Sequence, residues 1–135
     1  MIEVTLARLW IDKAKETFVL ILQESGGQRL LPIWIGPAEA ESIRIHLAGI
    51  PHERPLTHDL FKNMISALGG TVERIQITKV HQNTYFAELI VTVAGEAMTI
   101  DARPSDSIAI AVRTNAPIFA AESLLVIVGE SGSTT

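Results

Sequence analysis

The 135-residue chain contains no cysteine, and this absence narrows the chemistry open to it. Without thiols there is no disulfide scaffold, no thiolate nucleophile and no zinc site built on sulfur ligands. The N-terminus also lacks the basic region of a secretory signal, and no apolar run approaches the ~20 residues of a membrane span. We therefore expect a cytoplasmic protein with no membrane partner.

Charged and aromatic residues are also scarce. Charged residues make up 19% of the chain, and 15 acidic against 11 basic side chains leave a net charge of −4 at pH 7. Because a non-specific nucleic-acid binder normally carries a basic surface, this balance argues against broad binding to phosphate backbones. The aromatic residues, 5% of the chain, are too few for a base-stacking platform.

Hydrophobic residues are abundant instead, at 47% of the chain. They fall mostly in the expected strands and in one expected helix, near the C-terminus, that is apolar nearly all round. This is more apolar surface than a lone domain of this length needs to bury. We therefore expect a homodimer with an apolar interface.

The spacing of the apolar residues predicts a single α+β domain over residues 1–129, followed by a disordered tail at 130–135. Two antiparallel β-meanders are expected, each followed by a helix, with about three helices packed on the sheet. The expected strands are Ile2 to Ile11, Thr17 to Gln23, Arg29 to Ile35, Val72 to Val80, Thr84 to Val93 and Ala97 to Ala102. The expected helices are Ala38 to Leu47, Thr57 to Leu68 and Ser107 to Arg113, with short strands or tails at Ile118–Phe119 and Leu124–Val128.

Two of the helix starts resemble each other. Pro37 and Pro104 lie about half the chain apart, each after three expected strands, and an acid follows each proline two residues later, Glu39 or Asp106. Proline suits the first helical position, and an acid at the third meets free N–H groups and the positive end of the helix dipole. The pattern fits an internal duplication, but Pro-x-acid is also a common helix start, so both explanations stay open.

The helix expected between these two has clear end signals. Thr57 is a suitable N-cap, and Gly69–Gly70 can supply a left-handed C-cap. One face of this helix is apolar, formed by Leu60, Phe61, Met64, Ile65 and Leu68.

Most chemically active side chains fall in two segments, Arg54 to Asp59 and Asp101 to Asp106, and Arg113 follows two turns along the third helix. Each segment leads into a helix, where free backbone N–H groups favour anions and arginine adds bidentate donors for phosphate or carboxylate. The aspartates and the histidine could instead hold a hard cation such as Mg²⁺ or Mn²⁺, or orient a water molecule for attack. A structural role is the alternative for each group, as a helix-dipole partner or an ion-pair partner. The P-loop, dinucleotide-binding, nucleophile-elbow and zincin motifs do not occur.

The same two segments closely resemble the bifunctional nuclease domain family. The resemblance rests on the run Arg54 to Leu60, on Leu68 to Gly70 and on the run Ile100 to Arg113, and it extends from the first strand to Phe119. It implies a compact α+β domain found in bacteria and plants. Plant members are described as nucleases acting on both RNA and DNA, whereas many bacterial members have no assigned activity.

The resemblance also indicates which residues form the site. Physical reasoning then makes His58 a general acid or base, while Asp59, Asp101 and Asp106 hold a metal ion or position water. The substrate phosphate is assigned to three arginines, Arg54, Arg103 and Arg113. The family motif as a whole covers Arg54, Thr57, His58, Asp59, Asp101, Arg103, Ser105, Asp106 and Arg113. This hypothesis requires Asp59 and Asp101 to lie within about 12 Å of each other.

Two functions are therefore expected as alternatives. The first is a nuclease that hydrolyses phosphodiester bonds of RNA and DNA, assisted by a divalent cation such as Mg²⁺ or Mn²⁺. The second is a non-enzymatic, homo-oligomeric binding or regulatory module, in which a network of aspartates and arginines fixes the junction between sheet and helices. Exposed, convergent groups would favour the first function, and buried, mutually paired groups would favour the second.

Overall fold

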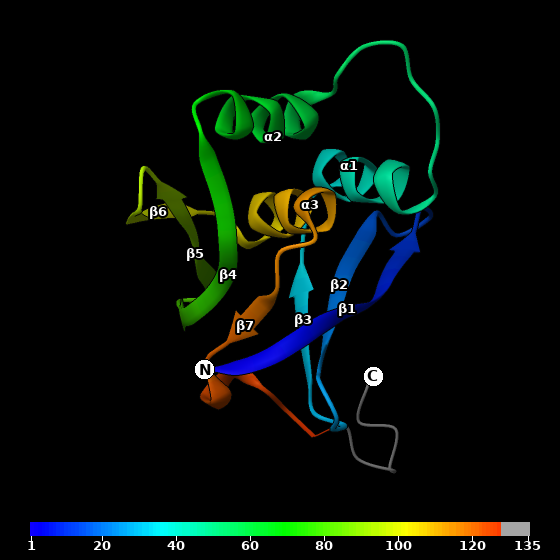
Figure 1. Cartoon of the computed structure of the whole chain (residues 1–135). Coiled ribbons are helices and arrows are strands. Elements are labelled where there is room, and N and C mark those ends of the chain that lie inside the picture. The colour runs from blue at the N-terminus through cyan, green and yellow to red at the C-terminus, as the bar shows by residue number, and fades with distance from the viewer. Residues whose placement is uncertain (128–135) are drawn as a thin grey trace.

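A computed structural model describes residues 1–127 of the chain. Within these residues, seven strands form one sheet in the order β3-β2-β1-β7-β4-β5-β6, and three α-helices cover one face of it (Figure 1). The predicted α+β class is therefore confirmed. The expected domain boundary after residue 129 and the expected tail at 130–135 lie outside the described residues.

The first half of the sheet is an antiparallel meander, as predicted. Its inner face is apolar because alternate residues point to the same side of a strand, so that Leu20, Leu22, Leu31 and Ile33 are all buried. A bulge in the first strand shifts the register between Leu6 and Arg8. The elements of this half are β1 (Ile2–Asp12), β2 (Thr17–Glu24), β3 (Leu30–Trp34) and α1 (Pro37–Leu47).

The second half repeats this arrangement after an intervening helix. Two tight turns join its strands, and the second contains Ala94 and Gly95, both with positive φ, as a two-residue hairpin requires. Its elements are α2 (Thr57–Ala67), β4 (Gly70–His81), β5 (Thr84–Val93), β6 (Glu96–Ala102) and α3 (Pro104–Thr114).

A short strand, β7 (Ile118–Ala120), joins the two halves. It pairs antiparallel with β1 and parallel with β4, so it lies at the centre of the sheet (Figure 1). The expected strand or tail from Leu124 is instead a 3₁₀ turn, Glu122–Leu124, followed by a single bridge between Val126 and Leu30.

The two halves therefore share one topology, a three-stranded meander followed by a helix that begins with proline. Pro37 and Pro104 are each the first helical residue, so Glu39 and Asp106 occupy the expected third positions. The helices α1 and α3 pack against each other. As predicted, α3 is buried on nearly all sides, because its central residues, Ile108 to Ala111, are at most 3% exposed.

The start of α2 differs from the prediction. Thr57 is the first helical residue, and Leu56 occupies the N-cap. The cap bond comes from the third helical position instead, where Asp59 Oδ2 accepts the Leu56 N–H at 2.9 Å. The end is as predicted, since Gly69 has a φ of +79° and donates its N–H to the Ser66 carbonyl.

None of the helices within residues 1–127 combines the length and the apolar character that crossing a membrane requires.

Candidate active site

An open groove of ≈ 950 Å³ lies where α1, α2, β6 and the start of α3 meet. Its walls are largely apolar, with Phe61 and Ile65 from α2, Leu89 from β5 and Ile100 from β6. His58 and Asp106, two of the predicted site residues, line it together with Ser42 of α1. The groove is therefore lined by side chains from both polar segments of the sequence, Arg54 to Asp59 and Asp101 to Asp106.

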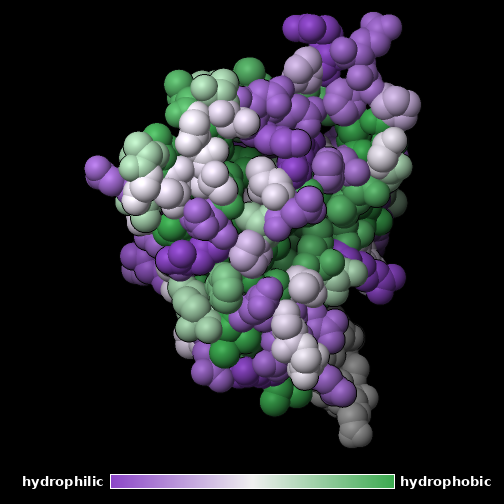
Figure 2. Space-filling model, viewed as in Figure 1, coloured by the Kyte–Doolittle hydropathy of each residue, from purple (hydrophilic) through white to green (hydrophobic). Residues whose placement is uncertain are grey.

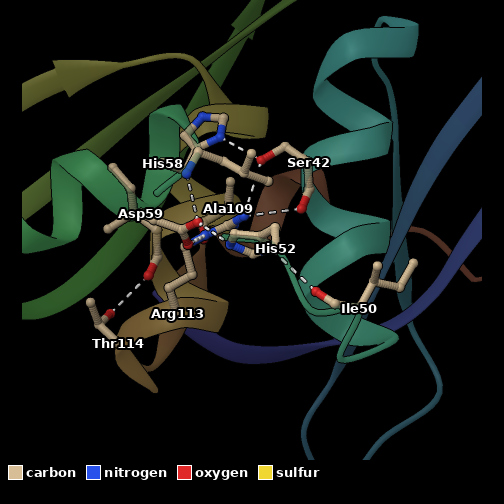
Figure 3. Close-up of polar contacts among 10 residues, drawn as sticks. Ser42, Ile50, His52, His58, Asp59, Ala109, Arg113 and Thr114 are labelled. Carbon is tan, nitrogen blue, oxygen red and sulfur yellow. Dashed lines mark hydrogen bonds and ion pairs between the residues drawn. The ribbon is translucent and has the colours of Figure 1, made fainter. Parts of the chain in front are cut away.

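His58 connects three helices. It lies in the first turn of α2 and is only 8% exposed. Its Nε2 lies 2.8 Å from Asp106 Oδ1 on α3, and its Nδ1 lies 2.6 Å from Ser42 Oγ on α1. Figure 3 shows Ser42 and His58 facing each other across the gap between their helices, with Arg113 beneath them.

The direction of these hydrogen bonds follows from their partners. An ionised carboxylate can only accept, so Nε2 of His58 carries a proton and donates it to Asp106. In the neutral ring Nδ1 then has a free lone pair, and the Ser42 hydroxyl donates to it. Asp106 thus fixes the tautomer in which His58 can take a proton from Ser42 or from a group in the groove.

Arg113 holds this arrangement from below. Its side chain is 1% exposed, and its Nε donates to Asp59 Oδ1 at 2.7 Å. The remaining guanidinium nitrogens reach the Ala109 carbonyl at 3.0 Å and the carbonyl and hydroxyl of Ser42 at 3.1 and 3.3 Å. All three guanidinium nitrogens of Arg113 therefore donate hydrogen bonds within the protein, to residues of α1, α2 and α3.

Asp59 has both carboxylate oxygens occupied. Oδ1 accepts from Arg113, while Oδ2 accepts from the Leu56 N–H and lies 2.9 Å from His52 Nε2. Burial by itself would raise the pKa of Asp59, but the hydrogen bonds from Arg113, Leu56 and His52 outweigh it and lower the pKa to about 2. Asp59 is thus an anion at any ordinary pH.

Arg103 lies at the mouth of the groove and is 64% exposed. It ties together the equivalent acids of the two helix starts, because its Nε donates to Asp106 Oδ2 at 2.8 Å and an Nη donates to Glu39 Oε2 at 3.3 Å. Burial opposes ionisation of Asp106, but the hydrogen bonds from Arg103 and His58 hold its pKa below the usual range. Arg103 is therefore an exposed cation in direct contact with Asp106, the partner of His58.

Five of the seven predicted catalytic and phosphate-binding residues thus belong to one bonded network: His58, Asp59, Arg103, Asp106 and Arg113. Asp101 and Arg54 do not. The register pairs Asp101 with Glu88, and the neighbouring Ile100 with Leu89 of the groove wall. By strand alternation the Asp101 side chain is directed away from that of Ile100, so Asp101 borders the groove at its rim without joining the network. Arg54 is exposed in the loop between α1 and α2, which Figure 2 shows as a hydrophilic projection at the top of the molecule.

Ser42 is the site residue that the sequence did not reveal. It stands in the middle of α1, 16 residues before His58, and no motif surrounds it. The sequence shows only that Ser42 follows Glu39 by three residues, a spacing that puts both side chains on the same side of α1. Since its partners come from two other helices, only their packing reveals its position.

A divalent cation does not fit this network. Within residues 1–127, there is no group of three or more His, Asp or Glu side chains arranged to hold a metal ion. The carboxylates of Asp59 and Asp106 already accept from arginine and histidine, so a cation there would displace those partners.

Comparison with known proteins identifies the family to which the chain is similar. The model of the bifunctional nuclease domain matches residues 20–131. A protein of Mycobacterium tuberculosis (strain H37Rv), named only as uncharacterized, is 39% identical over 127 residues, which is 94% of this chain and 76% of that protein. Bifunctional nuclease 2 of Oryza sativa subsp. japonica is 34% identical over 116 residues, and bifunctional nuclease 1 of Arabidopsis thaliana is 31% identical over 110 residues. These matches cover 84% and 79% of this chain but only 36% and 34% of the plant proteins.

Proposed function

The chain belongs to the bifunctional nuclease domain family, and from this premise we propose that it hydrolyses phosphodiester bonds of RNA and DNA in the groove between α1, α2 and β6. The observation that carries the proposal is the His58–Asp106 pair, an oriented imidazole at 2.8 Å from its carboxylate on the wall of an open groove. A histidine held in this way is a suitable general acid and base for a phosphodiester. Nucleic acid as the substrate class comes from the family and from the names of the plant relatives.

The other predicted residues take different parts in this proposal. Arg103 contacts a phosphate oxygen, since its guanidinium is exposed at the groove mouth. Arg113 and Asp59 are positioning residues, because their bonds are made within the protein and they hold Ser42 and the start of α2. Arg54 can meet the substrate backbone only from the exposed loop, and Asp101 only from the rim of the groove.

The charge of the groove limits how strongly it binds. Glu39, Glu41 and Asp106 line it, with Asp101 at the rim, against one arginine, Arg103. A polyanion is repelled by such a wall, so we expect weak binding whose strength depends little on released counter-ions. The enzyme would then act on short or single-stranded pieces with a high KM rather than hold long nucleic acid tightly.

A nuclease assay with matched variants tests this function. His58→Ala is expected to lose at least 100-fold in rate on RNA and DNA oligonucleotides, because general acid and base catalysis contributes about 10²–10⁴-fold. His81→Ala, an exposed histidine at the end of β4, is the control and should keep the wild-type rate. Equal activity of His58→Ala and wild type, when both are folded, would show that the groove does not carry the reaction.

A non-enzymatic module remains the second candidate, and one observation favours it. Arg113 is buried, its partner Asp59 is partly buried, and both make several hydrogen bonds within the protein, as in a network that fixes architecture. Such a module would bind a ligand without turning it over. Purified wild-type protein that binds an oligonucleotide or a small anion, yet releases no product under any cation supplied, would support this second function.

Self-association of the chain through the exposed side of α2 and β6 is a further part of the proposal. Most of the apolar face of α2 is not covered by the described residues: Ile65 packs against the core, but Leu60, Phe61 and Met64 are about half exposed and Leu68 is 73% exposed. β6 ends the sheet and is exposed along nearly its whole length, with Met98 and Ile100 on the side of the helices. An unblocked edge strand beside an apolar helix face is a surface that tends to pair with another chain.

The sequence of β6 suits a second copy as the occupant. In an antiparallel pair centred on Thr99, Met98 of each copy faces Ile100 of the other, while Glu96 and Asp101 each face alanine. No like charges then oppose each other across the two-fold axis. Light scattering after size exclusion should give a dimer for the wild type and a monomer for Met98→Lys, and a monomeric wild type at micromolar concentration would refute the homodimer.

A further inference from the structure

We infer that Ser42 is a nucleophile, activated by His58 and Asp106, which forms a covalent intermediate with the phosphorus atom of the substrate. The inference rests on the proposed function for its substrate class and deepens it, because it names the attacking atom. A serine, a histidine and an aspartate are joined in sequence by hydrogen bonds of 2.6 and 2.8 Å, and all three line the groove. A nucleophile next to a base that a third group orients is the geometric signature of covalent catalysis.

The Ser42 hydroxyl is polarised from two sides. It donates to His58 Nδ1 at 2.6 Å and accepts from an Nη of Arg113 at 3.3 Å. The first contact provides a base for the proton, and the second places a positive charge beside the oxygen that becomes an alkoxide. Because Arg113 is 1% exposed, water screens that charge little.

The rest of the network keeps these two groups in place. Asp106 holds His58 through Nε2 and stabilises the imidazolium that forms when Nδ1 takes the proton. Asp59 holds Arg113 through Nε, so that its remaining nitrogens stay directed at Ser42. Both aspartates are therefore positioning residues, and neither is needed as a proton carrier.

The groove leaves room for the electrophile. Ser42, His58 and Arg103 all border it, and Arg103 is exposed enough to bind a non-bridging phosphate oxygen. Its 3.3 Å contact with Glu39 is the longer of its two ion pairs, and a phosphate can replace Glu39 there while Asp106 stays bound.

The reaction balances without a further reactant. Ser42 Oγ attacks phosphorus and its proton passes to His58 Nδ1, while the bond from phosphorus to the leaving nucleoside oxygen breaks and that oxygen takes the proton from His58. The product is a phosphodiester between Ser42 and the remaining nucleotide. Water then gives a proton to His58 and attacks phosphorus, the bond to Oγ breaks, and the proton returns to Ser42. The net result is hydrolysis of one phosphodiester bond.

A phosphorus reagent tests the nucleophile without any nuclease assay. Diisopropyl fluorophosphate loses fluoride when an activated serine attacks its phosphorus, and the adduct is located by mass spectrometry of peptides. We expect labelling at Ser42 in the wild type and in the control Ser66→Ala, where an exposed serine of α2 is removed. Ser42→Ala should not be labelled there and His58→Ala should be labelled at least tenfold more slowly. A wild-type adduct absent from Ser42 would overturn the inference.

A cysteine variant provides a second test of activation at position 42, which can be used if Ser42→Ala does not fold. The chain has no native cysteine, so Ser42→Cys introduces a single thiol beside His58 and Arg113. This thiol should react with iodoacetamide at pH 7 at least tenfold faster than the thiol of Ser66→Cys, because neighbouring cationic and basic groups favour the thiolate. Equal rates would refute activation at position 42.

The two proposals fail in different ways. Labelling at Ser42 without nuclease activity would keep the activated serine and remove nucleic acid as the substrate. Nuclease activity in a folded Ser42→Ala variant at the wild-type rate would keep the proposed function and refute the covalent step, since His58 would then activate water directly.

Discussion

Arg113 is the residue on which the three helices converge. It binds Asp59 of α2, Ser42 of α1 and the Ala109 carbonyl of its own helix, and it is almost completely removed from solvent. An ion pair of this kind adds little beyond what apolar packing would give, but breaking it leaves an uncompensated buried charge. Loss of Arg113 would therefore destabilise the fold mainly by leaving the Asp59 carboxylate without its ion-pair partner.

We predict that Arg113→Ala lowers the free energy of unfolding by about 3–5 kcal/mol, the cost of removing one partner of a buried ion pair. Arg113→Lys should also be destabilised, because an ammonium cannot reproduce the fork of donors that reaches Asp59 and Ser42 together. Arg54→Ala, which removes an exposed loop arginine, is the control and should change stability by less than about 0.5 kcal/mol. Urea denaturation measures all three, and an unchanged midpoint for Arg113→Ala would contradict the prediction.

The lowered pKa of Asp59 predicts how the stability of the fold depends on pH. Its pKa is about 2 in the folded chain against an ordinary value of 3.8, so it stabilises the fold fully above pH 4 and loses that contribution as the pH falls toward 2. The contribution is on the order of 1–2 kcal/mol after allowance for its partial exposure. We predict that the difference in stability between the wild type and Asp59→Asn, measured by thermal melting, shrinks between pH 4 and pH 2. A constant difference over that range would show that the pKa of Asp59 is not lowered.

At the scale of elements, the hydrogen bonds and backbone conformation at the two ends of α2 set its length, while most of its apolar face is exposed. Asp59 caps its start through the Leu56 N–H, and Gly69 ends it in the left-handed region. Between them, His58 is the one helical residue of α2 that is buried. The helix therefore positions a catalytic candidate on its inner side while its apolar outer side stays open.

We predict that Gly69→Ala destabilises the chain by about 1–2 kcal/mol, because an L-residue pays this much in the left-handed region. The added methyl meets nothing within 4 Å, so strain of the backbone, not a clash, is the cause. Ser66→Ala, an exposed change on the same last turn, is the matched control and should stay within about 0.5 kcal/mol in chemical denaturation. A Gly69→Ala variant as stable as this control would mean that the C-cap relaxes to another conformation.

At the scale of the whole molecule, two similar halves are joined at two places. β7 bonds to the first strand of each meander, and α1 packs on α3 across the same junction. Arg103 adds a third link, since it binds Asp106 of one helix start and Glu39 of the other. Ser42 comes from α1 of the first half, whereas His58 and Asp106 come from α2 and α3 of the second, so the site depends on the assembly of both halves.

We predict that the chain unfolds as one cooperative unit. Both tryptophans, Trp10 and Trp34, belong to the first meander, so their fluorescence reports on that half, whereas far-UV circular dichroism reports on helices of the whole chain. The two probes should give the same urea midpoint, because β7 and the α1–α3 contact couple the halves. A fluorescence transition that clearly precedes the dichroism transition would show that the halves unfold separately.

Much of the fold could be predicted because its signals are local. Alternation of apolar residues identified the six main strands, and the helix starts followed from Pro37 and Pro104, whose rings suit the first helical position. The exchange of Thr57 for Leu56 as N-cap shows the limit of such signals. The helix begins at Thr57 itself, and the hydrogen bond at its start is the one that Asp59 accepts from the Leu56 N–H.

The sequence by itself determined the class of fold, the limits of most elements and the family of the protein, and it predicted that two polar segments would lie together. Only the tertiary structure decided what those segments form. Strand register turned Asp101 to the face away from Ile100, and helix packing buried Arg113 and brought Ser42 to His58. The physical reason is that these contacts join residues 16 to 71 positions apart, where no backbone periodicity operates and the packing of whole elements sets the distances.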